Sequence, residues 1–153
     1  MKLLWAALLV AALAPAAIAE QTVHLKMTAM RGSVEGVDPK VFDKGLADIR
    51  DAVRDLPYDT YHKVVASETR APFQKETRFK IDKRYTLCVT PESEDEHHSV
   101  RMQLRIEERV PDKPDKTVNA IKTTITIVPG HKIKFHGLDM DPGKLVVVLA
   151  ILD

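Results

Sequence analysis

The feature that most constrains the fold of this chain is a regular alternation of residue types over residues 100–107. Val100, Met102, Leu104 and Ile106 are apolar, and polar or charged residues separate them. Successive side chains of a β-strand point to opposite faces of a sheet, so this pattern predicts a strand with one buried face. Residues 117–128 alternate in the same way beyond a proline-containing loop. We therefore expect an extended antiparallel hairpin from these two segments.

Other segments read as strands divided by turn signals. The expected strands cover residues 23–29, 61–69, 73–81, 84–90, 131–136 and 144–152. The last of these is apolar along almost its whole length, and it is too short for a bilayer, which needs about 20 residues in a helix. A strand buried on both faces fits this composition.

One segment has the spacing of a helix. Asp38 is a suitable N-cap, Pro39 suits the first helical position and Pro57 ends the pattern. Apolar residues recur between them at steps of four and three, at Phe42, Leu46, Ile49, Val53 and Leu56. The sequence thus predicts an amphipathic helix over residues 39–56, lying on a sheet. The fold class that follows is α+β and mostly β, an antiparallel sheet or β-sandwich-like domain of about seven or eight strands with this one helix.

Residues 1–19 have the organisation of a secretory signal peptide. Lys2 supplies the positive charge, an apolar run follows it, and Ala17-Ile18-Ala19 forms a small-residue cleavage site. The alternative is an uncleaved membrane anchor, but the run is short for a span, and Pro15 is typical of a cleavage region. We expect one exported globular domain over residues 20–153, periplasmic or secreted, with no integral membrane span after cleavage.

Charge and cysteine content narrow the function classes. Without Lys2, 22 basic residues balance 22 acidic ones, which disfavours a nucleic-acid binder. Cys88 is the single cysteine, so an internal disulfide is excluded. It reads as a small strand residue or the site of an occasional intermolecular disulfide, with a nucleophile as the weaker alternative.

Two clusters are candidate binding sites. The first is a weak candidate for a divalent metal ion, for which a solvated hairpin loop is the alternative, and it comprises Glu94, Asp95, Glu96, His97 and His98. The second is a basic patch for an anionic polymer, with ordinary salt bridges as the alternative, and it comprises Lys75, Arg78, Lys80, Arg101, Arg105, Lys132 and Lys134, beside Lys83 and Arg84. Asp139 and Asp141 begin a calcium-loop spacing, but Gly143 and Ala150 occupy the later ligand positions. No cofactor is expected.

One local resemblance concerns the segment from Thr123 to Leu138. Its order of strand, Pro-Gly turn, strand and Gly-Leu resembles the pattern near the end of the secretin domain of outer-membrane secretion channels. That family usually has a Gly-Gly pair here, and His136 stands in place of its second glycine. The resemblance implies a similar hairpin and not a channel.

Enzymatic signatures such as a Gly-x-Ser-x-Gly elbow, a phosphate-binding glycine loop or a His-Glu-x-x-His pair are absent from the sequence. The leading hypothesis is a non-catalytic protein-binding or structural module in a periplasmic or outer-membrane assembly. Its partner would be an envelope protein or a second copy of the chain, bound by strand-edge pairing. The alternatives are a periplasmic protein that binds a small ligand or a divalent metal and, less favoured, an enzyme acting on cell-wall polymer.

Overall fold

The computed structural model describes residues 17–152. Most of the predicted signal peptide, residues 1–16, lies outside the described residues. Ala17, Ile18 and Ala19 are described and exposed. Within the described residues, no helix has the length and apolar character needed to cross a membrane.

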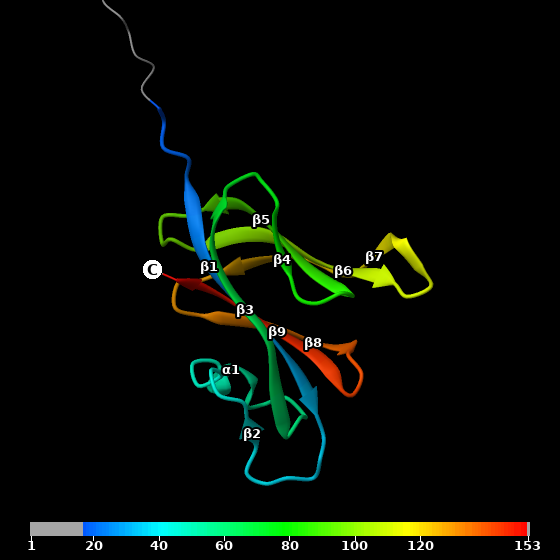
Figure 1. Ribbon diagram of the computed structural model, residues 1–153. Helices are drawn as coiled ribbons and strands as arrows, with labels where there is room; N and C mark the ends of the chain where they lie inside the picture. Colours follow the sequence, from blue (N-terminus) through cyan, green and yellow to red (C-terminus); the bar gives the residue numbers. More distant parts are fainter. Residues whose placement is uncertain (1–16, 153) are drawn as a thin grey trace, which may run out of the picture.

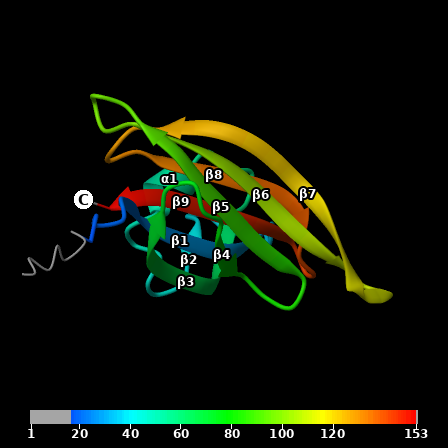
Figure 2. The same cartoon turned by 90° about the horizontal axis from the view of Figure 1, so that it is seen from above.

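The described chain folds into nine strands and one short helix, arranged as two facing sheets (Figures 1 and 2). This confirms the predicted fold class and adds a short strand to the expected number. The elements are β1 (Thr22–Ser33), β2 (Val41–Phe42), α1 (Arg50–Val53), β3 (Thr60–Pro72), β4 (Thr77–Lys80), β5 (Tyr85–Glu94), β6 (Val100–Val110), β7 (Lys113–Ile127), β8 (Lys132–Asp139) and β9 (Lys144–Leu152).

The strands divide into a five-stranded sheet and a four-stranded sheet. The five-stranded sheet has the order β2-β3-β1-β9-β8, and the four-stranded sheet has the order β4-β5-β6-β7. Neighbouring strands are antiparallel except β2 and β3, which are parallel. The four-stranded sheet therefore ends at β4 on one side and at β7 on the other.

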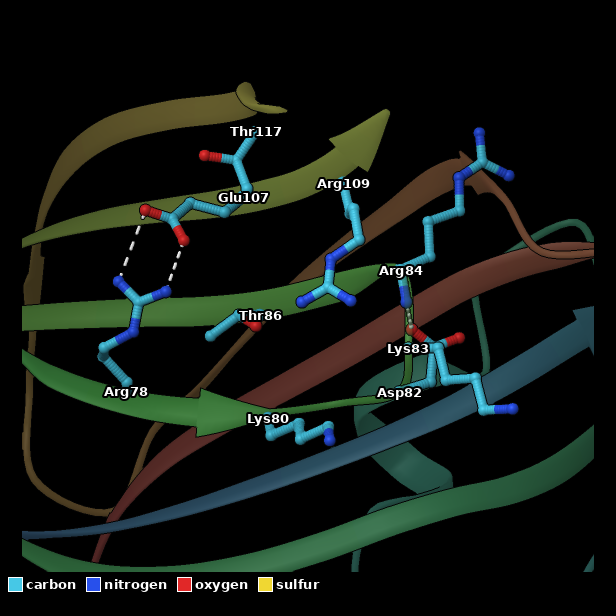
Figure 3. A pocket seen from close by; sticks show the side chains of 9 residues that line it. All are labelled: Arg78, Lys80, Asp82, Lys83, Arg84, Thr86, Glu107, Arg109 and Thr117. Atoms are coloured by element: carbon cyan, nitrogen blue, oxygen red, sulfur yellow. Dashed lines mark hydrogen bonds and ion pairs between the residues drawn. The ribbon is translucent and has the colours of Figure 1, made fainter. Parts of the chain in front are cut away.

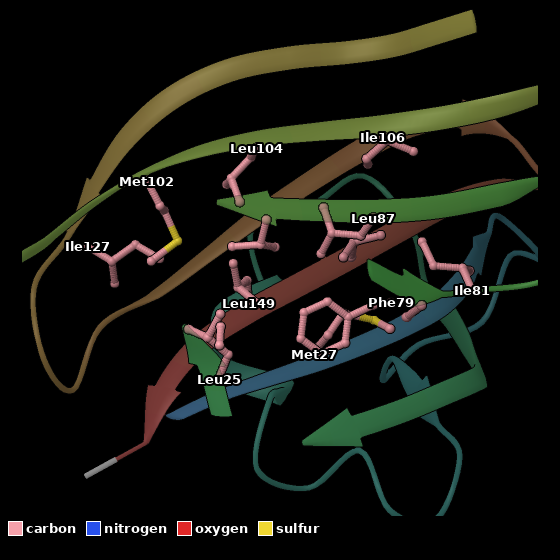
Figure 4. Close-up of a cluster of buried hydrophobic side chains, with 14 of the residues drawn as sticks. Leu25, Met27, Phe79, Ile81, Leu87, Met102, Leu104, Ile106, Ile127 and Leu149 are labelled. Carbon is pink, nitrogen blue, oxygen red and sulfur yellow. The ribbon is translucent and has the colours of Figure 1, made fainter. Parts of the chain in front are cut away.

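The main core lies between the two sheets, where the alternating apolar residues of both meet (Figure 4). Leu25 and Met27 of β1 face Leu87 of β5 and Leu104 of β6, and all four side chains are at most 1% exposed. Burying a side chain of this size contributes about 2 kcal/mol. The period of two seen in the sequence is the pattern that fills this layer.

Strand β9 is buried on both faces, as its continuous apolar sequence predicts. Leu145, Val147 and Leu149 face the main core, while Val146 and Val148 belong to a second apolar cluster. This second cluster covers the outer face of the five-stranded sheet with residues from the β2–β3 connection, and its other members are Met30, Leu46, Ile49, Val53, Leu56, Tyr58 and Tyr61.

The predicted helix over residues 39–56 is wrong in its extent, because regular helix is confined to α1. The beginning of the segment forms β2 instead, where Val41 pairs with Thr60 of β3. Gly45 then adopts a φ of +85°, a left-handed conformation that a right-handed helix does not contain. The last four apolar residues of the predicted helix are nevertheless buried, because a series of turns presents them to the sheet, and Phe42 of β2 is partly buried.

The predicted hairpin of residues 100–107 and 117–128 is confirmed by β6 and β7. Val100 pairs with Ile127 and Ile106 with Ile121, and the register shifts just beyond Ile106. In Figure 2 the far part of this hairpin projects beyond the body of the sandwich. The next strand, β8, lies in the other sheet, so residues 123–138 form a crossing between sheets and not a two-stranded hairpin.

Candidate functional site

The face of the four-stranded sheet that points away from the other sheet carries four of the basic side chains that the sequence singled out, from strands β4 and β6. In β6 the apolar members of the alternation enter the core, which leaves Arg101, Gln103, Arg105 and Glu107 on the outer face. Strand β4 places Arg78 and Lys80 there in the same way, since Phe79 between them is buried. The period of two thus builds a polar surface opposite the core.

The middle of this face is a network of two arginines and two glutamates. Arg78 bonds to Glu76 at 3.0 Å and also pairs with Glu107, which in turn pairs with Arg105. Arg105 closes the network by bonding to Glu76 at 2.7 Å. The hydrogen bonds from Arg78 and Arg105 hold the pKa of Glu107 below its usual range, against the opposing effect of partial burial. The carboxylates of Glu76 and Glu107 are therefore ionised at neutral pH, and each is already paired with both arginines.

Cys88 lies on β5 beneath this network and is 2% exposed. Burial raises the pKa of its thiol, and the nearby Arg105 and Arg78 oppose this only in part. A hollow of about 40 Å³ adjoins it. Since the thiolate is the nucleophilic form, this environment favours the small-strand-residue interpretation over that of a nucleophile.

A larger hollow opens at the end of the same face, where the β4–β5 turn meets the β6–β7 hairpin (Figure 3). We call it the basic cleft. Its volume is about 280 Å³, and it is lined by Arg78, Lys80, Asp82, Lys83, Arg84, Thr86, Glu107, Arg109 and Thr117. Five of these side chains carry positive charge and two carry negative charge.

The two acidic groups of the basic cleft are engaged within the protein. Asp82 accepts hydrogen bonds from the backbone N–H groups of Arg84 at 2.8 Å and Tyr85 at 2.7 Å, so it shapes the turn. Glu107 belongs to the arginine network described above. Among the basic residues of the cleft, Arg84 is also neutralised within the protein, because it forms an ion pair with Glu108. Within residues 17–152, Lys80, Lys83 and Arg109 form no ion pair.

The predicted basic patch is divided by the fold. Arg78 and Lys80 line the basic cleft, and Arg105 stands beside it in the arginine network. Arg101 lies toward the other end of β6, where it bonds to Glu92, and Lys75 precedes β4 and bonds to Glu20. Lys132 and Lys134 are on β8 in the five-stranded sheet, and Lys134 bonds to Asp55 beside α1.

The acidic and histidine-containing candidate for a metal site lies at the opposite end of the four-stranded sheet, in and beside the loop between β5 and β6. Glu94 bonds to His98, while Asp95 accepts backbone N–H groups of the loop. His97 lies 3.5 Å from Glu96. Among residues 17–152, no group of three or more such side chains is arranged to hold a metal ion.

Strand β7 is a second surface feature, because it has a neighbour on one side only. It pairs with β6 over most of its length and ends the four-stranded sheet. Ile121 and Ile125 pack partly on the core, whereas Thr124 and Thr126 are exposed. The outward edge of β7 therefore presents backbone N–H and C=O groups that no strand of the described residues satisfies.

The basic cleft contains residues that reasoning from the sequence missed. Arg109 continues the outward series at the same spacing of two, so the alternation of β6 could have found it; the earlier members are Arg101, Gln103, Arg105 and Glu107. Thr86 and Thr117 gave no such signal, since they depend on how β5 and β7 align with their neighbours. Comparison with protein families, curated proteins and solved structures gives no match.

Proposed function

We propose that this protein is a non-catalytic exported module that binds another envelope protein by strand pairing along β7, over residues 121–127. The observation that carries the proposal is the one-sided pairing of β7 in a sheet that is otherwise well packed. An added strand would complete the backbone hydrogen bonds of this edge. Such recognition uses main-chain groups and needs no diagnostic motif, in agreement with a sequence that contains none.

The composition of β7 separates a protected part from an accessible part. Its first residues, Lys113, Pro114, Asp115 and Lys116, have the charges and the proline that discourage edge pairing. Residues 121–127 contain Lys122 as their single charge, and the others are isoleucine and threonine, which favour strands. The accessible part of the edge is therefore the part that lies against the body of the sandwich.

The other sheet edges are less suited to a partner strand. Strands β2 and β4 have two and four residues. The open edge of β3 carries Lys63, Glu68 and Arg70, and it ends in Pro72. On β8 two lysines project, and Lys134 is held by Asp55. Charge, proline and short length are the devices that protect edges, so β7 is the favoured one.

The proposal is tested by co-purification from native envelopes with paired variants. Thr124→Lys with Thr126→Lys puts two charges on the exposed side of the β7 edge. Val64→Lys with Ala66→Lys makes the same change at two exposed positions of β3 and serves as the matched control. Loss of strand pairing worth about 1.4 kcal/mol lowers the amount of partner recovered about tenfold.

The expected result is that wild type and the β3 variant recover the same envelope protein, and that the β7 variant recovers about one tenth as much. Equal recovery by both variants, with both folded, would contradict strand pairing at β7. Absence of any envelope partner, with a monomeric protein in extracts, would overturn the proposal as a whole.

A further inference from the structure

We infer that the basic cleft is a binding site for a ligand with two or more linked phosphate groups. This inference is independent of strand pairing along β7. Three cationic side chains that form no ion pair within residues 17–152 line a hollow of defined volume: Lys80, Lys83 and Arg109.

The positive charge of the cleft exceeds what its own acids neutralise. Arg78 is paired with Glu107 and Glu76, and Arg84 is paired with Glu108. Asp82 is engaged by two backbone N–H groups of its turn. An incoming anion therefore meets three available cations without breaking an ion pair, and these cations attract it through the combined field of the cleft.

The spacing of the three cations indicates more than one anionic group. Lys80 is on β4 and Arg109 is on β6, and β5 lies between them. Adjacent strands are about 4.8 Å apart, so the two backbones are separated by about 10 Å. Lys83 stands at the β4–β5 turn, where the backbone N–H of Arg109 bonds to Arg84 at 2.8 Å. A chain of linked phosphates matches this width, whereas a single phosphate contacts one part of it.

The remaining lining suits phosphate oxygens. In Figure 3 the side chain of Arg109 extends from β6 over β5 toward Thr86. Thr117 is the cross-strand partner of Arg109 on β7. Hydroxyl groups donate hydrogen bonds to phosphate, and the arginine fork can bind two oxygens at once. The volume of about 280 Å³ accommodates a short phosphate chain.

The test is calorimetric titration of the purified protein with tripolyphosphate at physiological ionic strength, which screens charges outside the cleft, with citrate as the carboxylate comparison. We expect tripolyphosphate to bind and citrate to bind about tenfold more weakly. The variant Lys80→Glu, Lys83→Glu, Arg109→Glu should lose binding. The matched control, Lys44→Glu, Arg70→Glu, Lys132→Glu, changes net charge equally outside the cleft and should bind within about twofold of wild type.

A soluble phosphate chain and a lipid headgroup offer the same chemistry, and vesicles distinguish these sources. If phosphatidylcholine vesicles containing diacylglycerol pyrophosphate, a lipid with two linked phosphates, sediment the wild type but not the cleft variant, a lipid surface supplies the phosphates. If they sediment neither and tripolyphosphate binds, the ligand is soluble.

Three results would overturn the inference: no binding of tripolyphosphate to the wild type, equal binding of citrate, or equal losses in the cleft and control variants. If the cleft variant fails to fold, nuclear magnetic resonance of the wild type decides. Tripolyphosphate should then shift the Arg109 side-chain N–H signal and the amides of residues 80–86. Shifts confined to other parts of the molecule would refute the site.

Discussion

At the scale of single residues, the turn before β9 depends on a close approach between two glycines. Gly143 has a φ of +105°, and a Cβ built on it would lie 2.5 Å from the carbonyl oxygen of Gly32. Gly130 has a φ of +81°, but a Cβ built there meets no atom within 4 Å. The two positions share the left-handed backbone and differ in whether there is room for a side chain.

We predict that Gly143→Ala lowers the free energy of unfolding by about 3 kcal/mol and Gly130→Ala by about 1 kcal/mol. The first substitution adds a clash with backbone to the cost of positive φ, while the second has the backbone cost alone. Urea denaturation of the two variants measures the difference. Equal losses of stability would show that Gly143 does not approach Gly32 as closely as described.

At the scale of elements, the segment between β2 and β3 acts as an apolar cover without being a regular helix. Four-residue turns succeed one another, with the N–H of Leu46 bonded to the C=O of Asp43 and the N–H of Ile49 bonded to the C=O of Leu46. The next turn bonds Ala52 to Ile49. These turns place an apolar side chain over the sheet at each step, so burial here follows from turn geometry.

We predict that Ile49→Ala lowers the free energy of unfolding by about 3 kcal/mol, because this side chain is 1% exposed in the second apolar cluster. Val41→Ala in the same segment should cost about 0.5 kcal/mol or less, since Val41 is 49% exposed. Thermal or urea denaturation gives both values. A small effect of Ile49→Ala would mean that the segment does not pack on the sheet.

The strands were predictable from the sequence, and the helix was not. Alternation in β6 and the apolar run of β9 each have one interpretation, since a period of two or continuous burial fixes how a strand meets the core. Apolar residues at steps of three and four have two interpretations, because a helix and a series of turns both place such residues on one side. Gly45 was the local sign against a continuous helix.

At the scale of the whole molecule, the basic patch could be predicted only in part. Alternation told which side chains of β4 and β6 share a face. Of these, Arg78 and Lys80 line the cleft and Arg105 stands beside it, whereas Arg101 lies toward the other end of β6. It did not tell which sheet β8 joins, because sheet membership depends on contacts distant in sequence. Lys132 and Lys134 consequently lie on the other sheet.

The ion pairs spread over both sheets make stability depend on pH. Several carboxyl groups have pKa values held below the usual range, mainly by hydrogen bonds to cations or backbone N–H groups: Asp48, Asp55, Asp59, Glu76, Asp95, Glu107 and Asp139. The folded state then binds fewer protons than the unfolded state in acid. Their contribution is present above the unfolded pKa of about 4 and is lost as the pH falls through the folded values.

We predict that stability in urea declines below about pH 4.5, and that Glu76→Gln with Glu107→Gln makes this decline shallower. The double variant should already be less stable than wild type at neutral pH, because Arg78 and Arg105 lose their partners. The same acid dependence in both proteins would contradict the role assigned to this network.

The central claim is that β7 receives a partner strand over residues 121–127, and amide hydrogen exchange on the complex recovered from envelopes tests it most directly. A partner strand should slow exchange at alternate amides of residues 121–127, whose N–H groups point away from β6, and leave the β3 edge unchanged. Unchanged exchange along β7, with protection on another surface of the recovered complex, would contradict the claim.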